Sequence, residues 1–240
     1  MVIRDLWSAL YTDDIPAEQT GRECDFIMQF LPLAEFPDVL DLACGTGRHS
    51  IELARRGYGT AAVDMDPKAL HVAEASACTA GVSIQFIVAD LLDLGTLDRT
   101  FDGILLFWQS FGYFDTDAQA GLFTSFHRLL RPGGRLILDL YNRLHFTRGF
   151  VPHAHNDFHE PLPVWDISLF RPLPLGYEED LRFERRRAVD LFDPHLFSPG
   201  EIAGLAANYD FHLIASCSDF HPTTPATPEK ARMQLAFERL

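Results

Sequence analysis

The chain of 240 residues has little positive charge. It carries 20 Lys and Arg against 34 Asp and Glu, which gives a formal net charge of −14. Proteins that bind nucleic-acid backbones gather positive charge on one face, so this balance argues against a nucleic-acid partner. It suits a protein that acts on a small molecule.

Cysteines are few, and long apolar runs are missing. The four cysteines, Cys24, Cys44, Cys78 and Cys217, lack the spacing of metal ligands, so we expect reduced thiols and no metal site. No apolar run approaches the roughly 20 residues of a membrane span. Residues 1–20 carry charges throughout and contain no apolar core of a signal peptide. We therefore expect a cytoplasmic protein with no membrane partner, and whether it forms a homo-oligomer stays open.

Apolar runs and helical segments alternate along the first part of the chain. The runs that predict strands are 37–42, 60–64, 83–90, 101–108 and 135–141. The segments that predict helices between them are 48–56, 67–81 and 116–130. Continuous apolar strands are typical of a parallel sheet that helices cover on both faces. A further helix is expected at 198–209, followed by two closing strands at 211–220 and 231–239.

The organisation that we expect is one domain over residues 1–240, because 47% of the residues are hydrophobic and no repeat or long low-complexity tract divides the chain. Residues 1–35 are expected to form a helical cap at the N-terminus. Residues 143–187 are rich in Pro, His and aromatic residues and predict an insertion over the sheet edge, which would act as a lid over the acceptor.

The stretch "VLDLACGTGRHS", residues 39–50, places two glycines between a strand and a helix. Glycines let a ligand approach the backbone closely, and the helix that follows offers free N–H groups. Asp64 ends the second strand 17 residues after Gly47, where a carboxylate can accept hydrogen bonds from ribose hydroxyls. Asp66 and Pro67 follow as cap and first residue of the next helix. The sequence therefore predicts a nucleoside site.

Three features separate a dinucleotide from S-adenosyl-L-methionine as the ligand. The pyrophosphate-binding motif G-x-G-x-x-G has a third small residue, usually glycine. Ser50 occupies that position here. Asp41 would oppose a pyrophosphate, yet its carboxylate suits a ligand with ammonium and sulfonium groups. Asp90 ends the third strand beside apolar residues, an arrangement that can bind an adenine. These features favour S-adenosyl-L-methionine.

The stretches "VLDLACGTGRHSIELARRGY", "AAVDMDPKAL", "FIVADLLDL" and "LRPGGRLILDLYN" resemble the ordered motifs of class I S-adenosylmethionine-dependent methyltransferases of the small-molecule type. The resemblance implies an α/β fold, a Rossmann-like doubly wound seven-stranded sheet with the last strand antiparallel. It also implies that Asp41 and the 43–47 loop contact the methionine part, Asp64 the ribose, and Asp90 with Leu91 the adenine. Ala43 replaces the common glycine. The cofactor residues that we expect are Tyr11, Asp41, Ala43, Gly45, Gly47, Asp64, Met65, Asp90, Leu91 and Phe107.

The stretch "FWQSFGYF", residues 107–114, resembles the acceptor side of small-molecule methyltransferases. We expect Trp108, Ser110 and Tyr113 to bind the substrate. Ser110 lacks the preceding glycine of an esterase elbow, which argues against a nucleophile. Phe111 fits an acceptor pocket and an ordinary core equally well.

A protein base is needed only if the acceptor arrives protonated. The catalytic candidates are Tyr141, Asn142, His153 and His155. The last two belong to "HAHNDFHE", residues 153–160, whose alternatives are a solvated loop or, less in keeping with its spacing, a metal site. Tyr11 is a candidate lid residue or the end of an amphipathic helix.

The function that we expect is methyl transfer from S-adenosyl-L-methionine to a small-molecule acceptor, with an amine as one hypothesis. One alternative is an enzyme of the same fold that uses this cofactor for cyclisation or aminocarboxypropyl transfer. Others are an NAD-dependent reductase and a non-catalytic protein that senses the cofactor.

Overall fold

The computed structural model describes residues 15–147, 165–166, 171–172 and 195–240. The chain divides into two compact units, residues 1–146 with 194–240 and residues 147–193. In the second unit, the described residues form strands β6 (Trp165–Asp166) and β7 (Arg171–Pro172), which pair antiparallel. The second unit overlaps the range 143–187, and the expectation that this range is an insertion that acts as a lid stays a prediction.

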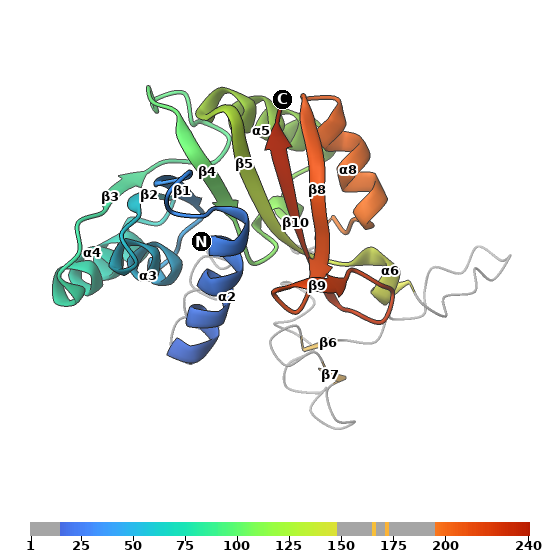
Figure 1. Ribbon diagram of the computed structural model, residues 1–240, viewed down its shortest axis with the longest axis horizontal. Helices are drawn as coiled ribbons and strands as arrows, with labels where there is room; N and C mark the ends of the chain where they lie inside the picture. Colours follow the sequence, from blue (N-terminus) through green and yellow to red (C-terminus); the bar gives the residue numbers. More distant parts are fainter. Residues whose placement is uncertain (1–14, 148–164, 167–170, 173–194) are drawn as a thin grey trace, which may run out of the picture. The chain divides into compact units, whose positions relative to one another are not determined.

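The first unit alternates strands and helices in the predicted order (Figure 1). Its helices are α2 (Ala17–Phe30), α3 (Arg48–Arg55), α4 (Pro67–Ala80), η1 (Ser110–Tyr113), α5 (Thr116–Leu129), α6 (Arg143–Phe146) and α8 (Pro199–Ala207). Its strands are β1 (Asp38–Leu42), β2 (Gly59–Asp64), β3 (Gln85–Val88), β4 (Phe101–Leu106), β5 (Leu130–Tyr141), β8 (Phe211–Ser218), β9 (His221–Pro225) and β10 (Arg232–Arg239).

The strands form one sheet in the order β3-β2-β1-β4-β5-β10-β8-β9. Strands β1 to β5 are parallel to one another, and β10 runs antiparallel between β5 and β8. The predicted Rossmann-like sheet with an antiparallel last strand is confirmed. Its carboxyl ends bring the segments after β1, β2, β3, β4 and β5 to one edge, where ligands bind in such sheets.

The strand count differs from the expected seven, because β9 adds an eighth. The stretch "HPTTP" carries Pro222 and Pro225, which favoured a loop. Proline occurs in sheets at edge strands, where no ladder hydrogen bond is lost, and β9 is the edge strand beside β8. Strand β5 also begins at Leu130, ahead of the expected 135, across an irregularity in its pairing with β4.

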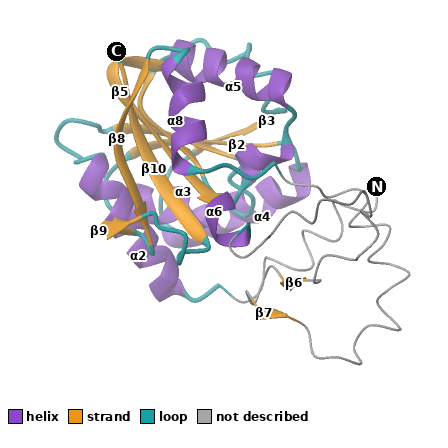
Figure 2. Ribbon diagram, turned by 90° about the vertical axis from the view of Figure 1, so that its right-hand side faces the viewer, coloured by secondary structure: helices purple, strands orange, loops and turns teal. Residues whose placement is uncertain are grey.

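Two apolar clusters cover the two faces of the sheet. One contains Phe26 and Ile27 of α2 with Val39 and Leu105 from the sheet. The other joins α5 and α8 to the opposite-facing strand residues, among them Leu40. Figure 2 shows α5 and α8 on one side of the sheet and α2 on the other. The alternation along β1 therefore turns Asp41 toward the side of α2 and α3, since side chains alternate along a strand.

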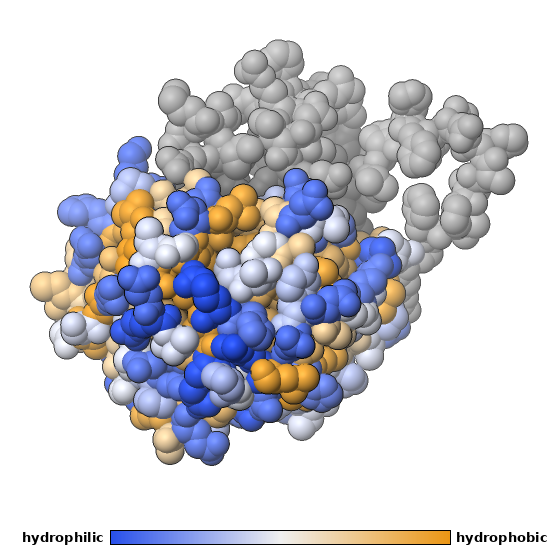
Figure 3. All heavy atoms as spheres, turned by 90° about the horizontal axis from the view of Figure 1, so that it is seen from above, coloured by the Kyte–Doolittle hydropathy of each residue, from blue (hydrophilic) through white to orange (hydrophobic). Residues whose placement is uncertain are grey.

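The chain has no helix, within the part that the structure describes, that is long and apolar enough to cross a membrane. Figure 3 shows one face of the molecule, on which hydrophilic and hydrophobic residues are intermixed.

Candidate functional site

The glycine loop joins β1 to α3 through three residues with positive φ. Ala43, Gly45 and Gly47 have φ values of 53°, 56° and 77°. This left-handed region favours glycine, which explains why the family has glycine where Ala43 stands here. The backbone N–H of Cys44 donates to the carbonyl of Val63 at 3.0 Å. The loop is thus fixed against the end of β2.

Asp64 holds this loop through its carboxylate. Its Oδ2 accepts from the N–H of Gly45 at 2.8 Å, and its Oδ1 accepts from the N–H of Asp66 at 2.9 Å. Asp66 itself caps α4 by accepting from the N–H of Lys68, as predicted. An ionised carboxylate has about four acceptor positions, so Asp64 retains capacity for two hydroxyl donors such as those of a ribose.

Asp41 lies under the loop and is 2% exposed. The hydroxyl of Ser50 donates to its Oδ2. Burial raises the pKa of the Asp41 carboxyl, and the positive and hydroxyl groups around it oppose that rise. A buried carboxylate of this kind is stabilised by a cation, which the ammonium and sulfonium of S-adenosyl-L-methionine would supply. Ser50 therefore has a physical role here that a glycine could not fill.

A buried group that the sequence interpretation missed ties α2 to α3. Glu23 is 1% exposed, and its Oε2 lies 2.5 Å from Nη1 of Arg48 and 2.6 Å from Nε2 of His49. Burial raises the pKa of Glu23, but the hydrogen bond from His49 and the charges of His49 and Arg48 lower it to about 2. Burial lowers the pKa of His49. The first turn after the glycine loop is therefore anchored to the N-terminal helix, a contact that no local motif indicates.

The residues expected at the adenine lie beyond the carboxyl ends of β2 and β3. Asp90 accepts from the N–H of Leu92 at 2.9 Å through Oδ1. Leu91 is buried in the core, whereas Met65 is exposed by 51%. One oxygen of Asp90 is thus occupied, and the side chain of Met65 faces solvent beside the edge of the sheet.

The turn that we expect on the acceptor side begins with two residues in the left-handed region. Trp108 and Gln109 have φ values of 56° and 64° directly after β4. Asp139 of β5 holds both residues, since its Oδ2 accepts from the N–H of Trp108 and its carbonyl accepts from the N–H of Gln109, each at 3.0 Å. Gln109 is buried and also links Tyr141 to His195 through its amide. Positive φ at two non-glycine residues is strained, and such strain often marks functional sites.

Charged groups surround the Trp108 ring. The guanidinium carbons of Arg48 and Arg232 lie 5.2 Å and 4.9 Å from the ring centroid. Arg232 pairs with the fully buried Asp139, which also accepts from Nε2 of Gln234 at 2.8 Å. A cationic acceptor at Trp108 would have to compete with these two guanidinium groups. Phe107, the residue before Trp108, is buried edge-to-face against His49 at 5.1 Å.

The other aromatic residues of this stretch separate into core and surface. Phe111 is fully buried against Phe123 and Phe197, which settles it as core. Tyr113 is exposed by 40%, and the Ser110 hydroxyl donates to the carbonyl of Phe107 at 2.9 Å. Of the two expected substrate residues in η1, Ser110 and Tyr113, Tyr113 is thus the more exposed.

Asn142 is fully buried, and its side chain is occupied. Its Nδ2 donates to the carbonyls of Thr227 and Lys230 at 2.9 Å and 3.2 Å, and its Oδ1 accepts from the N–H of Leu144 at 3.1 Å. The geometry does not support the expected contact with the acceptor, because the amide would have to leave these partners. Tyr141 is half-buried, with its ring edge-to-face to Phe146 at 5.8 Å.

Three of the expected residues, Tyr11, His153 and His155, lie outside the described residues. Their roles therefore stay predictions. Among the residues that the structure describes, no three His, Cys, Asp or Glu side chains are grouped as metal ligands would be.

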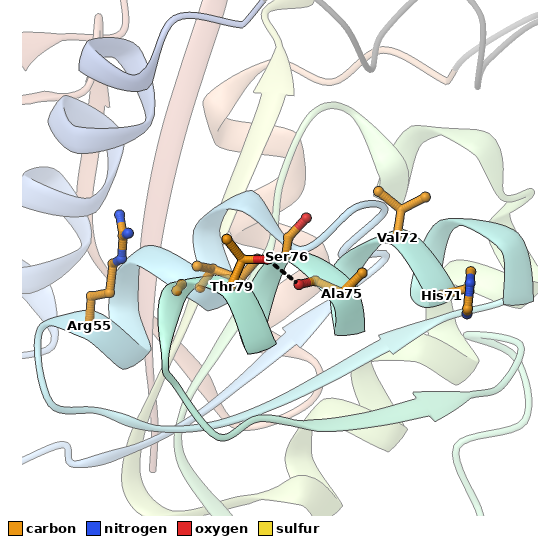
Figure 4. Close-up of a pocket in the computed structure, with 8 residues that line it drawn as sticks. Arg55, His71, Val72, Ala75, Ser76 and Thr79 are labelled. Carbon is orange, nitrogen blue, oxygen red and sulfur yellow. Dashed lines mark hydrogen bonds between the residues drawn. The ribbon is translucent and has the colours of Figure 1, made fainter.

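A shallow cavity of about 460 Å³ is lined by residues of α3 and α4 (Figure 4). Its lining comes from the two helices: Ile51, Arg55, His71, Val72, Ala75, Ser76, Thr79 and Ala80. None of the residues discussed above contributes to it, so this cavity is not the expected cofactor site.

The left-handed glycine loop, the buried Asp41 and the hydrogen bond of Asp64 to the loop have the arrangement that the sequence predicts for a nucleoside site in an α/β fold. Comparison with known proteins agrees with this class. Residues 39–134 match the family model described as a methyltransferase domain. The protein YqeM of Bacillus subtilis (strain 168), described as a methyltransferase without a stated substrate, is 28% identical over 202 residues, which cover 81% of each chain.

Two further matches extend the comparison. The demethylmenaquinone methyltransferase of Thermus thermophilus is 33% identical over 102 residues, 42% of this chain and 45% of that protein. The crystal structure of an S-adenosylmethionine-dependent methyltransferase from Clostridium acetobutylicum has the same fold, with a TM-score of 0.68 at 18% identity, and covers 99% of this chain and 97% of that one. The chain is thus similar to S-adenosylmethionine-dependent methyltransferases, over residues 39–134 in the family model and over the fold in the solved structure.

Proposed function

We propose that the chain transfers a methyl group from S-adenosyl-L-methionine to a small-molecule acceptor by in-line displacement. The observation that carries the proposal is the carboxylate of Asp64, which holds Gly45 in a left-handed turn. A Cβ built on Gly45 meets nothing within 4 Å, so the space in front of this backbone is open for a ligand.

The bound cofactor supplies the reactive sulfonium and the methyl group. The chain contributes binding and alignment, which are the main protein contributions to such a displacement. Asp41 offsets positive charge beside the glycine loop, and Asp64 and Asp90 accept hydrogen bonds from the nucleoside. The turn after β4, fixed by Asp139, forms the acceptor side.

An amine acceptor was suggested by the acidic composition and the aromatic residues of 107–114. The surroundings of Trp108 weaken this hypothesis, because two guanidinium groups already lie over its ring. The acidic composition alone selects for no particular acceptor. The proposal therefore stays at a small molecule, with the methylated atom open.

The test is product analysis on the purified full chain with a panel of amines, phenols, thiols and carboxylic acids. Methyl transfer forms S-adenosylhomocysteine together with an acceptor heavier by one methylene unit. Cyclisation or aminocarboxypropyl transfer would leave methylthioadenosine, and binding of NAD in preference to S-adenosylhomocysteine in calorimetry would favour the reductase. Turnover with no member of the panel would favour a cofactor-sensing protein.

A further inference from the structure

We propose that His145 is the general base that takes the proton from the molecule to be methylated, with Asn142 as its positioning residue. This inference rests on the proposed methyl transfer. It replaces the expected contact between Asn142 and the acceptor by an indirect role, and it adds a histidine that the sequence interpretation did not single out.

The location of His145 follows from β5. Strand β5 ends at Tyr141 on the carboxyl edge of the sheet, and α6 carries His145 one turn later. The ring of His145 is edge-to-face to that of Phe146 at 5.2 Å, and Phe146 in turn packs against Tyr141 at 5.8 Å. His145 thus follows the carboxyl end of β5, the strand next to β4, and the turn after β4 is the proposed acceptor side.

The hydrogen bond of His145 fixes its tautomer. Nδ1 lies 3.0 Å from the carbonyl oxygen of Pro228. A carbonyl oxygen accepts and never donates, so Nδ1 must carry the proton. The neutral ring then presents the lone pair of Nε2, which hydrogen-bonds to no other residue in the described part of the chain. An imidazole whose one nitrogen is oriented by a carbonyl and whose other nitrogen accepts protons has the arrangement of a general base.

Asn142 contacts both the loop that contains Pro228 and the backbone of His145. Its Nδ2 donates to Thr227 and Lys230, the residues that flank the turn containing Pro228. Its own carbonyl accepts from the N–H of His145 at 2.9 Å. The buried amide therefore sets the distance between the ring and the carbonyl that orients it, which explains why the chain buries a fully bonded asparagine at this point.

The charged groups around His145 are largely paired with one another. Arg143 of α6 lies 2.5 Å from Glu201 of α8, and Lys230 pairs with Asp219. Glu229 follows Pro228 in the same turn. In the transfer, the acceptor's proton passes to Nε2 while its lone pair forms the bond to methyl, and the sulfonium leaves as a neutral thioether. Protonated His145 keeps its hydrogen bond to Pro228 and returns the proton to water.

The first experiment needs no acceptor. Long-range proton–nitrogen NMR of the full chain with bound S-adenosylhomocysteine should show the neutral ring of His145 as the Nδ1–H tautomer. His71 on α4, which lines the helix cavity, is the reference histidine. An Nε2–H tautomer at His145 would overturn the proposal.

The second experiment uses H145N and H145Q with the acceptor that the panel identifies. The asparagine amide can replace Nδ1 in the bond to Pro228 but cannot accept a proton as Nε2 does. We expect H145N to bind S-adenosylhomocysteine normally, to lose about 10²–10⁴ in kcat and to lose the limb of the pH profile that the imidazole produces. H145Q should lose the same activity and also some stability, and H71N should lose neither.

The two proposals fail in different ways. A wild-type chain that forms no S-adenosylhomocysteine with any acceptor rejects methyl transfer, and the role of His145 with it. A wild-type chain that turns over, together with an H145N variant of full activity, rejects the role of His145 alone.

Discussion

The half of the candidate site that we assign to the cofactor and the half that we assign to the acceptor are built by different kinds of contact. Around the glycine loop, the contacts span few residues: Ser50 to Asp41 spans 9, Asp66 to Asp64 spans 2 and Gly45 to Asp64 spans 19. On the acceptor side, the contacts join distant segments. Gln109 reaches His195 across 86 residues and Gln234 reaches Asp139 across 95.

Because of this difference, substitutions in the two halves are expected to affect ligand binding and stability to different extents. The cofactor half depends on backbone conformation within a short stretch, so a local substitution can remove the ligand and leave the sheet intact. The acceptor half is held by buried polar groups that also connect β5 to the closing strands. Substitutions there are expected to affect stability and acceptor geometry together.

The largest expected effect is on cofactor binding, from Gly45→Val. A β-branched residue strongly disfavours φ near 56°, and its side chain would occupy the open space in front of the loop. Binding of S-adenosylhomocysteine in calorimetry should fall below detection. Gly81→Val is the matched control, since Gly81 has φ 70° and equally open surroundings at the end of α4. Both variants should lose about 1–2 kcal/mol of unfolding free energy, and only the first should lose the ligand.

Asp139→Asn should have the largest effect on stability. It leaves the partly buried Arg232 beside a neutral group, and the cost of about 3–5 kcal/mol for losing one partner of a fully buried ion pair is the upper bound of the expected loss. Denaturant unfolding should show this loss, while the folded fraction should still bind S-adenosylhomocysteine. A variant as stable as the wild type would contradict the assignment of Asp139 as the link between β5 and the closing strands.

Asp64→Asn tests the point where loop and ligand share one carboxylate. We expect a loss of about 1.5–3 kcal/mol in the binding free energy of S-adenosylhomocysteine, the range for hydrogen bonds to a charged group. Asp66→Asn is the control two residues on, because asparagine caps helices about as well as aspartate does. Equal affinities of the two variants in calorimetry would reject the ribose role of Asp64.

The smallest effect is expected from Ser50→Ala, about 0.5–1.5 kcal/mol in the binding free energy of S-adenosyl-L-methionine at neutral pH. Burial already raises the pKa of Asp41, and removal of the Ser50 hydroxyl should raise it further. Because the cationic ligand favours the ionised carboxyl, affinity should rise with pH, and the variant should need a higher pH to reach the same affinity. Calorimetry across pH checks this, with Asp41→Asn as the variant that should show no such dependence.

The sequence was sufficient for the alternation of strands and helices and for the glycine loop, because apolar runs, Asp66 with Pro67, and Gly81 are local features. It was insufficient for Asp139, Gln109 and Glu23, because a buried polar residue is recognised only through partners that are distant in the chain. Asn142 shows the same limit: its position after β5 suggested contact with the acceptor, whereas its hydrogen bonds to the loop at 227–230 are seen only in the structure. The eighth strand was missed because prolines outweighed the alternation of "HPTTP".

That eighth strand bears on how copies of this chain can associate. Two of the five residues of β9 are prolines, which have no N–H to offer a further strand. At the opposite border of the sheet, β3 contains only four residues. A short border and a proline-bearing border both disfavour growth of the sheet from one molecule into the next. If the chain forms a homo-oligomer, its helices are therefore the more suitable contact surfaces, and the exposed backbone of the sheet is protected against aggregation.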